Sequence, residues 1–168
     1  DLLAGAWRAR PSSHRAVLVA TPRAHDAEMR ERIERHRADR AARVPAMTTV
    51  EEPLELARAI RARGDARTLV LVDCLTLWLT NLAMPMRGEG GLTGSVESAT
   101  ADLVDAVADA RGPVVLIGNE IGLGVIRMGS EVRAFVDALG RLNQAAAGTC
   151  DRVTLMVAGL PLALEVAG

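Results

Sequence analysis

The chain contains no lysine, and all 20 of its basic residues are arginines. A mechanism that needs a lysine Schiff base or a lysine contact to phosphate is therefore excluded for these 168 residues. Aromatic residues are also scarce, at 2% of the chain, so no aromatic patch marks an interface with another protein. Arginine is the side chain left to bind anionic groups.

A basic excess, clustered cysteines and long apolar runs are missing as well. The formal net charge is −1, from 20 basic and 21 acidic side chains, which does not provide the basic surface that nucleic-acid binding needs. Cys74 and Cys150 lie too far apart for a metal cluster or a disulfide framework. No run approaches the roughly 20 apolar residues that span a bilayer, and no stretch has the pattern of a signal peptide. We therefore expect a reduced, cytoplasmic protein that binds neither nucleic acid nor a membrane.

Short apolar runs alternate with longer helical patterns along the chain. Four runs rich in β-branched residues are typical of strands buried on both faces, at 16–20, 68–72, 113–117 and 153–157. Between them, Ser130 is placed to cap one helix, and Thr49 to cap another that Gly64 ends. Strands that alternate with helices predict a parallel sheet in a single α/β domain over residues 1–168.

Small or polar residues follow each of these apolar runs. In an open parallel sheet the ligand binds beyond the carboxyl ends of the strands, so these residues are candidates for the site. They are Thr21 and Pro22, then Asp73, Cys74 and Thr76, then Gly118, Asn119 and Glu120, and last Gly159. An acid that ends an apolar strand, as Asp73 does, is the pattern that orders Mg²⁺ beside a nucleotide phosphate. The alternative is that Asp73 caps the following helix, and the residues alone favour neither interpretation.

Two glycine-containing segments leave alternatives open. Residues 118–124, GNEIGLG, follow a buried strand and either let the backbone approach a ligand closely or form an ordinary turn before a helix. Residues 84–95, MPMRGEGGLTGS, predict a loop that is either a lid or subunit contact, or a connection without a function. Trp78 lies on a helical pattern and is expected to pack in the core.

The segment 26–40 predicts an amphipathic helix that carries His36. Five residues at spacings of three and four share one face of it: Asp26, Met29, Ile33, His36 and Arg40. His36 is therefore expected to point toward the body of the protein. Arg32, Arg37 and Arg40 surround it, and nearby cations disfavour imidazolium and leave the neutral, nucleophilic ring. The same arginines would bind nucleotide phosphates and stabilise a pentavalent transition state. The alternative is that His36 has a structural role and hydrogen-bonds a backbone carbonyl. For a histidine considered alone, this structural role is the favoured one.

Six segments spread over nearly the whole chain occur, in this order, in one known family. They are VATPRAHDAEMRERIERHR (19–37), EEP (51–53), LVLVDCLTLWLTN (69–81), GNEIGLGVI (118–126), DALGRLNQ (137–144) and DRVTLMVAGLPL (151–162). With these segments the chain resembles the bifunctional adenosylcobinamide kinase/adenosylcobinamide-phosphate guanylyltransferases of cobalamin biosynthesis. Several separate matches in the right order are far more specific than any one of them.

The resemblance implies a fold, two reactions and a set of site residues. The fold is a P-loop NTPase-like (RecA-like), mainly parallel sheet flanked by helices. The reactions are phosphorylation of adenosylcobinamide and transfer of GMP from GTP to the product through a guanylylated histidine, which gives adenosylcobinamide-GDP. His36 matches that histidine, and Asp73 matches the Walker B acid, expected to bear on Mg²⁺ or the nucleotide. The family's other nucleotide contacts match Thr21, Arg37, Ala38, Asp39, Arg40 and Glu51. GTP and ATP are then substrates, and a homo-oligomer is expected.

Family members begin with a strand and a glycine-rich loop of the form GGxRSGKS, which this chain lacks. Residues 1–10 predict the helix that follows that loop, so we expect the strand and the loop to precede this chain in the full protein. The 168 residues alone are expected to be inactive, because positioning and charge neutralisation supply most of the catalysis of phosphoryl transfer. Smaller departures are Gly118, where the family usually has Ser or Thr, Arg127 in place of a proline, and Met47 in place of a tryptophan.

Two rival hypotheses use the same residues differently. A catalytically silent relative would bind cobinamide or a nucleotide as a scaffold or interface protein. An unrelated small-molecule kinase on the same fold would use Asp73 but would have no need of His36. Formation of a GMP adduct on His36 separates the enzyme from both.

Overall fold

A four-stranded parallel sheet is the central element of the computed structural model, which describes residues 14–24, 27–85, 94–124 and 129–164. Its strands are β1 (Arg15–Ala20), β2 (Met47–Glu51), β3 (Thr68–Asp73) and β4 (Val114–Ile117). Their order is β2-β1-β3-β4, and every neighbouring pair is parallel. The predicted α/β class is confirmed. The helix expected over residues 1–10 and most of the loop expected over 84–95 lie outside the described residues.

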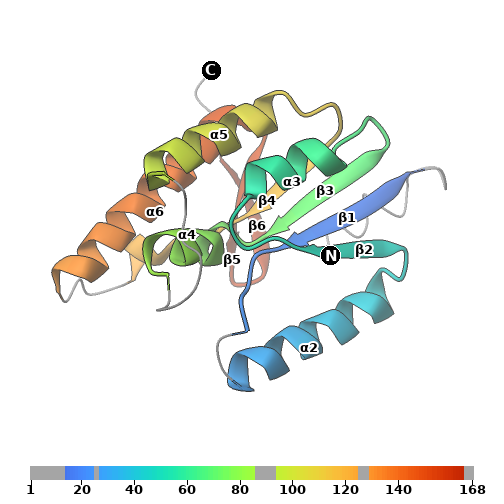
Figure 1. The fold of residues 1–168 in the computed structure, drawn as a ribbon, viewed down its shortest axis with the longest axis horizontal. Helices are drawn as coiled ribbons and strands as arrows, with labels where there is room; N and C mark the ends of the chain where they lie inside the picture. The colour runs from blue at the N-terminus through green and yellow to red at the C-terminus, as the bar shows by residue number, and fades with distance from the viewer. Residues whose placement is uncertain (1–13, 25–26, 86–93, 125–128, 165–168) are drawn as a thin grey trace.

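Helices connect the strands, and most of them lie on one face of the sheet (Figure 1). They are α2 (Ala27–Arg43), α3 (Leu56–Arg63), α4 (Leu75–Ala83), α5 (Val96–Ala108) and α6 (Ser130–Thr149), with a short 3-10 helix, η1 (Ile121–Leu123), after β4. Helices α3 to α6 lie together over the sheet, whereas α2 lies apart from them, next to β2 (Figure 1). Within the described ranges, no helix has the length and apolar character needed to cross a membrane.

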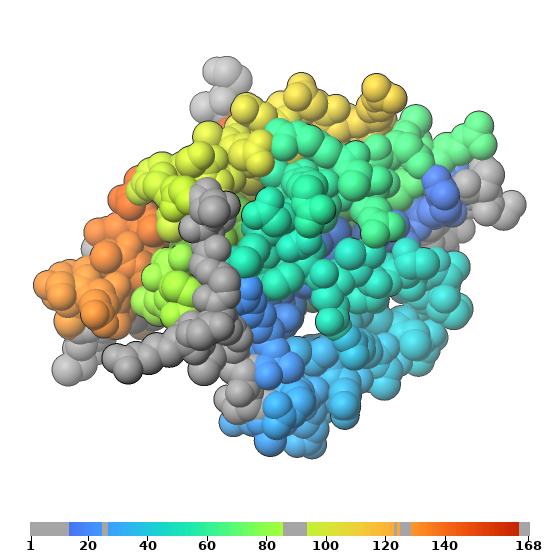
Figure 2. All heavy atoms as spheres, viewed as in Figure 1, coloured from blue at the N-terminus to red at the C-terminus, as the bar shows by residue number. Residues whose placement is uncertain are grey.

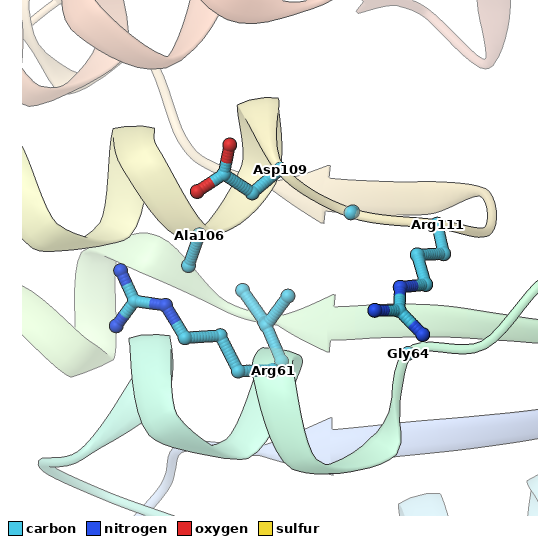
Figure 3. A pocket seen from close by; sticks show the side chains of 7 residues that line it. Arg61, Gly64, Ala106, Asp109 and Arg111 are labelled. Atoms are coloured by element: carbon cyan, nitrogen blue, oxygen red, sulfur yellow. The ribbon is translucent and has the colours of Figure 1, made fainter.

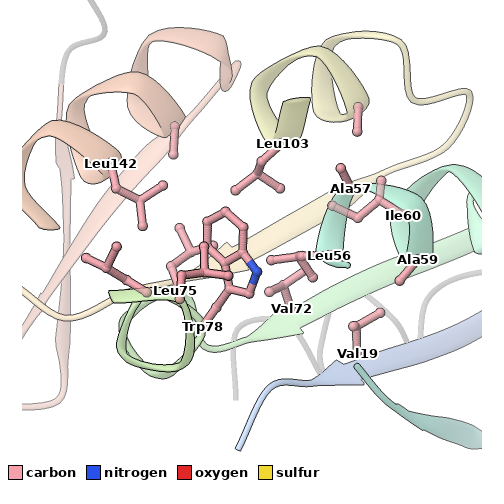
Figure 4. Packing of buried hydrophobic residues seen from close by; sticks show 14 of the residues in the cluster. Val19, Leu56, Ala57, Ala59, Ile60, Val72, Leu75, Trp78, Leu103 and Leu142 are labelled. Carbon is pink, nitrogen blue, oxygen red and sulfur yellow. The ribbon is translucent and has the colours of Figure 1, made fainter. Parts of the chain in front are cut away.

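The hydrophobic core lies between the sheet and helices α3 to α6 (Figure 4). Its fully buried members come from all of these elements: Val19, Val70 and Val72 from the strands, and Leu56, Ile60, Trp78, Leu79, Leu103, Leu139 and Leu142 from the helices. Trp78 is 1% exposed, and its indole Nε1 donates a hydrogen bond to the carbonyl of Leu54 at 2.8 Å. Trp78 therefore packs in the core, as predicted, with its one polar atom satisfied.

The second face of the sheet is only partly covered by the described residues. In β3, Val70 and Val72 are fully buried, whereas Leu69 and Leu71 on the opposite face are half-buried. The prediction of strands buried on both faces was therefore too strong. An apolar run shows that a strand belongs to a sheet, but the helices around it decide how many faces are covered.

The predicted helix starting at Thr49 was wrong in its first part. Residues 47–51 form β2, which pairs with β1, and α3 begins only at Leu56. Glu52 Oε1 accepts hydrogen bonds from the backbone N–H groups of Leu54 (3.2 Å) and Glu55 (2.9 Å), so Glu52 arranges the start of the helix. A threonine followed by a glutamate three residues on also fits a strand that ends just before that glutamate, as β2 does at Glu51.

The other predicted helix boundaries were closer to the structure. Gly64 ends α3 as predicted, and its N–H donates to the carbonyl of Ile60 at 2.8 Å. At α6, Gly129 occupies the N-cap position with a φ of 83°, and Ser130 is the first helical residue rather than the cap. Glycine readily adopts this positive φ, so the cap lies one residue earlier than predicted.

Strand β5 (Val153–Val157) forms as predicted, but it does not join the parallel sheet. It pairs antiparallel with β6 (Leu160–Leu164), a strand that the sequence analysis missed. Ala158 and Gly159 form the turn between them, with φ values of 51° and 79°. The hairpin is not buried, since Leu160 is 70% exposed. The expected burial of this strand, and the expected place of Gly159 at the ligand edge, were wrong because the tight turn decides the strand's partner.

Asn81 in α4 is buried and joins two chain segments near the carboxyl edge of the sheet. Its Nδ2 donates hydrogen bonds to the carbonyls of Thr21 (2.8 Å) and Pro53 (3.1 Å). Asn81→Ala leaves both carbonyls without this donor, so we expect the free energy of unfolding in urea to fall by about 1–3 kcal/mol. In the control Thr80→Ala, the lost hydroxyl bonds only the carbonyl of Thr76 in the same helix, and the change should stay within about 0.5 kcal/mol. Equal losses in both variants would contradict the prediction.

Candidate functional site

The carboxyl ends of strands β1 to β4 meet at one edge of the sheet. The register places Ala20 beside both Glu51 and Asp73, and Asp73 beside Ile117. Residues that end or follow these strands therefore lie close together, as predicted for Thr21, Asp73 and the turn at 118–120. Glu51 joins them as the last residue of the unpredicted strand β2.

Thr21 is fully buried, and its hydrogen bonds connect the end of β1 to the segment that follows β3. Its hydroxyl donates to the carbonyl of Cys74 and accepts from the N–H of Cys74, both at 2.8 Å. Its own N–H donates to the carbonyl of Asp73 at 3.1 Å. Thr21 thus positions Asp73 and Cys74 through three hydrogen bonds to the backbone.

Asp73 ends β3 and is half-buried at the edge. Helix α4 begins at Leu75 with Cys74 at the N-cap position, so the alternative in which Asp73 caps this helix was wrong. Burial is the main cause that raises the pKa of the Cys74 thiol, and the Arg32 guanidinium is the smallest of the effects that oppose it.

His36 lies in the predicted helix, but it does not point into the protein. Its side chain is exposed, and none of the 17 residues of α2 is buried against the described part of the chain. Met29, Ile33 and Arg40 are half-buried, so the predicted face exists. Helix α2 lies at the margin of the molecule (Figure 2), and the exposure of His36 shows that only part of that face is covered. Helical spacing shows which residues share a face but not how far a neighbour covers it. The imidazole is open to a ligand.

The predicted nucleotide contacts in α2 fall into two groups. Arg37 forms an ion pair with Glu51 at the end of β2, and both side chains are about half exposed. Arg40 Nε is buried and has no hydrogen-bond partner within the described ranges. Ala38 and Asp39 are exposed. Arg37 therefore connects α2 to the edge of the sheet through Glu51, whereas no such connection of Arg40, Ala38 or Asp39 is seen among the described residues.

The turn after β4 is held from two sides, by Thr76, which was predicted to lie near the ligand edge, and by Asn143, which the sequence analysis did not single out. On one side, Thr76 Oγ1 accepts hydrogen bonds from the backbone N–H (3.1 Å) and the Nδ2 (3.2 Å) of Asn119. On the other, Asn143 Nδ2 donates to the carbonyl of Asn119 (3.2 Å) and to Glu120 Oε1 (2.7 Å). The segment DALGRLNQ contains Asn143, but spacing in a helix cannot show that its amide reaches this turn.

Two hollows lie at opposite ends of the sheet. One, of about 360 Å³, lies between η1 and α6 and is bounded by Glu120 and Asn143. The other, of about 330 Å³, lies between α3 and α5 with Arg61, Asp109 and Arg111 at its rim (Figure 3). The second hollow is at the amino ends of β3 and β4, because these helices lead into those strands. Parallel sheets bind ligands at the carboxyl ends, so only the first hollow adjoins the candidate site.

Comparison with known proteins identifies the family. Residues 4–164 match the model of the cobinamide kinase / cobinamide phosphate guanyltransferase family. The chain belongs to this family. The assignment drawn from six sequence segments is thereby confirmed.

Three relatives of this cobinamide kinase / guanyltransferase are bifunctional adenosylcobalamin biosynthesis proteins. The one from Pseudomonas aeruginosa is 45% identical over 150 residues, which cover 88% of this chain and 80% of the relative. The one from Escherichia coli is 29% identical over 161 residues, with 91% and 87% covered. The one from Salmonella typhimurium is 28% identical over 181 residues, with 98% of both covered.

The Arg37–Glu51 ion pair of this cobinamide kinase / guanyltransferase is expected to contribute little to stability. Exposed ion pairs contribute about 0.2–1 kcal/mol, so Arg37→Gln should lower the free energy of unfolding in urea by no more than about 1 kcal/mol. Added salt should reduce this difference, because it screens exposed charges. Arg35→Gln, which removes the Glu31–Arg35 pair on the same helix, is the control. A loss above about 2 kcal/mol for Arg37→Gln alone would show instead that α2 depends on this pair.

Proposed function

We propose that this protein phosphorylates adenosylcobinamide and then transfers GMP from GTP to adenosylcobinamide phosphate through a guanylylated His36. The observation that carries the proposal is the exposed His36 on an arginine-rich helix whose Arg37 pairs with Glu51 at the carboxyl edge of the sheet. The family match over residues 4–164 supports both activities. The product of the guanylyl transfer is adenosylcobinamide-GDP.

The guanylyl transfer proceeds in two displacement steps. An unprotonated ring nitrogen of His36 attacks the α-phosphorus of GTP, an N–P bond forms, and the bond to the β-phosphate oxygen breaks to release pyrophosphate. A phosphate oxygen of adenosylcobinamide phosphate then attacks the same phosphorus, and the N–P bond breaks. The arginines near His36 stabilise negative charge on the phosphate oxygens. Arg40, one turn from His36 on the half-buried side of α2, is one of these arginines.

Phosphorylation of adenosylcobinamide is assigned to the edge around Asp73. Mg²⁺ in such sites is commonly held by one or two carboxylates together with substrate phosphates and water. The half-buried carboxylate of Asp73 fits this requirement, although the described residues include no cluster of three or more His, Cys, Asp or Glu side chains. When bound, Mg²⁺ neutralises charge on the phosphate oxygens. Thr21 fixes the backbone of Asp73, so the carboxylate is held at the edge.

The proposal includes the other partners that the family resemblance suggests. GTP and ATP are the nucleotide substrates, and the protein assembles as a cytoplasmic homo-oligomer. Exposed apolar side chains on the β5–β6 hairpin, such as Leu160 and Leu162, support an assembly, because apolar patches commonly mark interfaces.

A covalent adduct tests the role of His36. Full-length protein incubated with Mg²⁺ and GTP labelled at the α-phosphate should retain label that is labile in acid and stable in base, because a phosphoramidate has this stability. His36→Ala should abolish the label, whereas His14→Ala should keep it. An unlabelled wild-type protein, or label that persists in His36→Ala, would contradict the proposal.

The kinase reaction tests the role of Asp73. Asp73→Asn should lower kcat/KM for phosphorylation by about 100-fold or more, because an amide cannot supply the charge that orders the metal and the phosphates. Asp65→Asn is the matched control, since Asp65 lies before the opposite end of β3, where it accepts hydrogen bonds from Arg67 and Thr68. It should change kcat/KM by less than about threefold. Equal losses in both variants would remove Asp73 from the site.

A further inference from the structure

The turn that follows β4 carries an exposed carboxylate whose position is set by another residue. Glu120 lies outside regular structure and is exposed, so its side chain would be free to rotate without a partner. Asn143 Nδ2 supplies that partner, at 2.7 Å from Glu120 Oε1. Among the described residues only Oε1 has a partner, so Oε2 can accept a hydrogen bond from a substrate hydroxyl or N–H group.

Asn143 is itself firmly placed. It lies on α6 next to Leu142 and one turn from Leu139 and Ala146, all of which are buried in the core. The same amide nitrogen that binds Glu120 also binds the carbonyl of Asn119 at 3.2 Å. The core of the protein is thus connected through Asn143 to both the backbone and the carboxylate of the turn.

The turn is also held relative to Asp73. Thr76, three residues after Asp73, accepts two hydrogen bonds from Asn119, and the register places Asp73 beside Ile117, the last residue of β4. Asp73 and Glu120 therefore stand on neighbouring strand ends whose connections are tied together by Thr76, Asn119 and Asn143.

Gly118 shows how closely Asn143 approaches the turn. A Cβ added at Gly118 would lie 3.1 Å from Asn143 Oδ1, which is tighter than ordinary side-chain contacts. The small residue at this position lets the amide of Asn143 lie against the backbone of the turn.

We propose that Asn143 is a positioning residue for the reaction at the carboxyl edge, which it serves by orienting the Glu120 carboxylate toward the substrate beside Asp73. The inference rests on the proposed function. The positioning role of Asn143 depends on hydrogen-bond donation by its amide and not on the volume of its side chain. Variants that change one of these properties and not the other therefore test it.

The test compares Asn143→Asp with Asn143→Leu in the full-length protein. Asn143→Asp preserves the shape of the side chain, but it removes the donor and places a carboxylate opposite Glu120. We expect Asn143→Asp to lower kcat of at least one of the two reactions by about 10- to 100-fold, and by more than Asn143→Leu. The melting temperature should change little, because the groups that lose their donor are exposed and accept from water instead.

Variants of an exposed residue on the same helix provide matched controls. Ala134 on α6 is exposed and does not line this hollow, so Ala134→Asp and Ala134→Leu introduce the same charge and the same apolar group away from the turn. Both should keep kcat within about threefold of the wild type. A role in packing alone would give the opposite order at position 143, with Asn143→Asp close to the wild type and Asn143→Leu impaired.

A double-mutant cycle tests whether Asn143 acts through Glu120. If it does, adding Asn143→Leu to Glu120→Gln should lower kcat by no more than about twofold beyond Glu120→Gln alone. Gly118→Ala adds a Cβ close to Asn143 Oδ1. It should therefore lower kcat in the wild type but not in the Asn143→Ala variant, which lacks the amide. Additive losses in the first cycle, or activity unchanged in Asn143→Asp, would overturn the inference while leaving the proposed function intact. A wild-type protein without either activity would overturn both.

Discussion

The parallel pairing of β1 with β3 is the constraint on which the candidate site depends. It places Ala20 beside Asp73, and the buried hydroxyl of Thr21 then bonds both backbone groups of Cys74. Two hydrogen bonds of this hydroxyl and a third from the Thr21 N–H to the carbonyl of Asp73 leave the end of β3 little freedom. The position of every other element at the edge follows from this junction, since β2 pairs with β1 on one side and β4 with β3 on the other.

The two sides of the edge differ in how firmly they are built. Helix α2, which carries His36, has no buried residue in the described structure, and its visible tie to the sheet is the half-exposed Arg37–Glu51 ion pair. The turn with Glu120 is instead tied to the core through Asn143 on α6. Burial contributes far more stability than an exposed ion pair, so the core fixes the Asp73 side much more strongly than the His36 side.

The distribution of apolar surface fits the same division. Nearly all of the fully buried side chains lie between the sheet and helices α3 to α6, and Trp78 is the largest of them. The opposite face of β3 is half-buried, and the β5–β6 hairpin presents Met156 and Leu160 to solvent. Stability is therefore concentrated in one layer, and that layer also supports the Asp73–Glu120 side of the site.

The sequence by itself determined the α/β class, the family, the ends of β1, β3 and β4, and the grouping of Thr21, Asp73 and Glu120 at one edge. These features depend on apolar runs, on local motifs and on the rule that parallel strands end together. Only the tertiary structure decided that His36 is exposed, that β5 pairs with a hairpin partner, and that Asn143 holds Glu120. Each of these depends on which distant segment packs against a residue, and helical or strand spacing shows the shared face but not the neighbour that covers it.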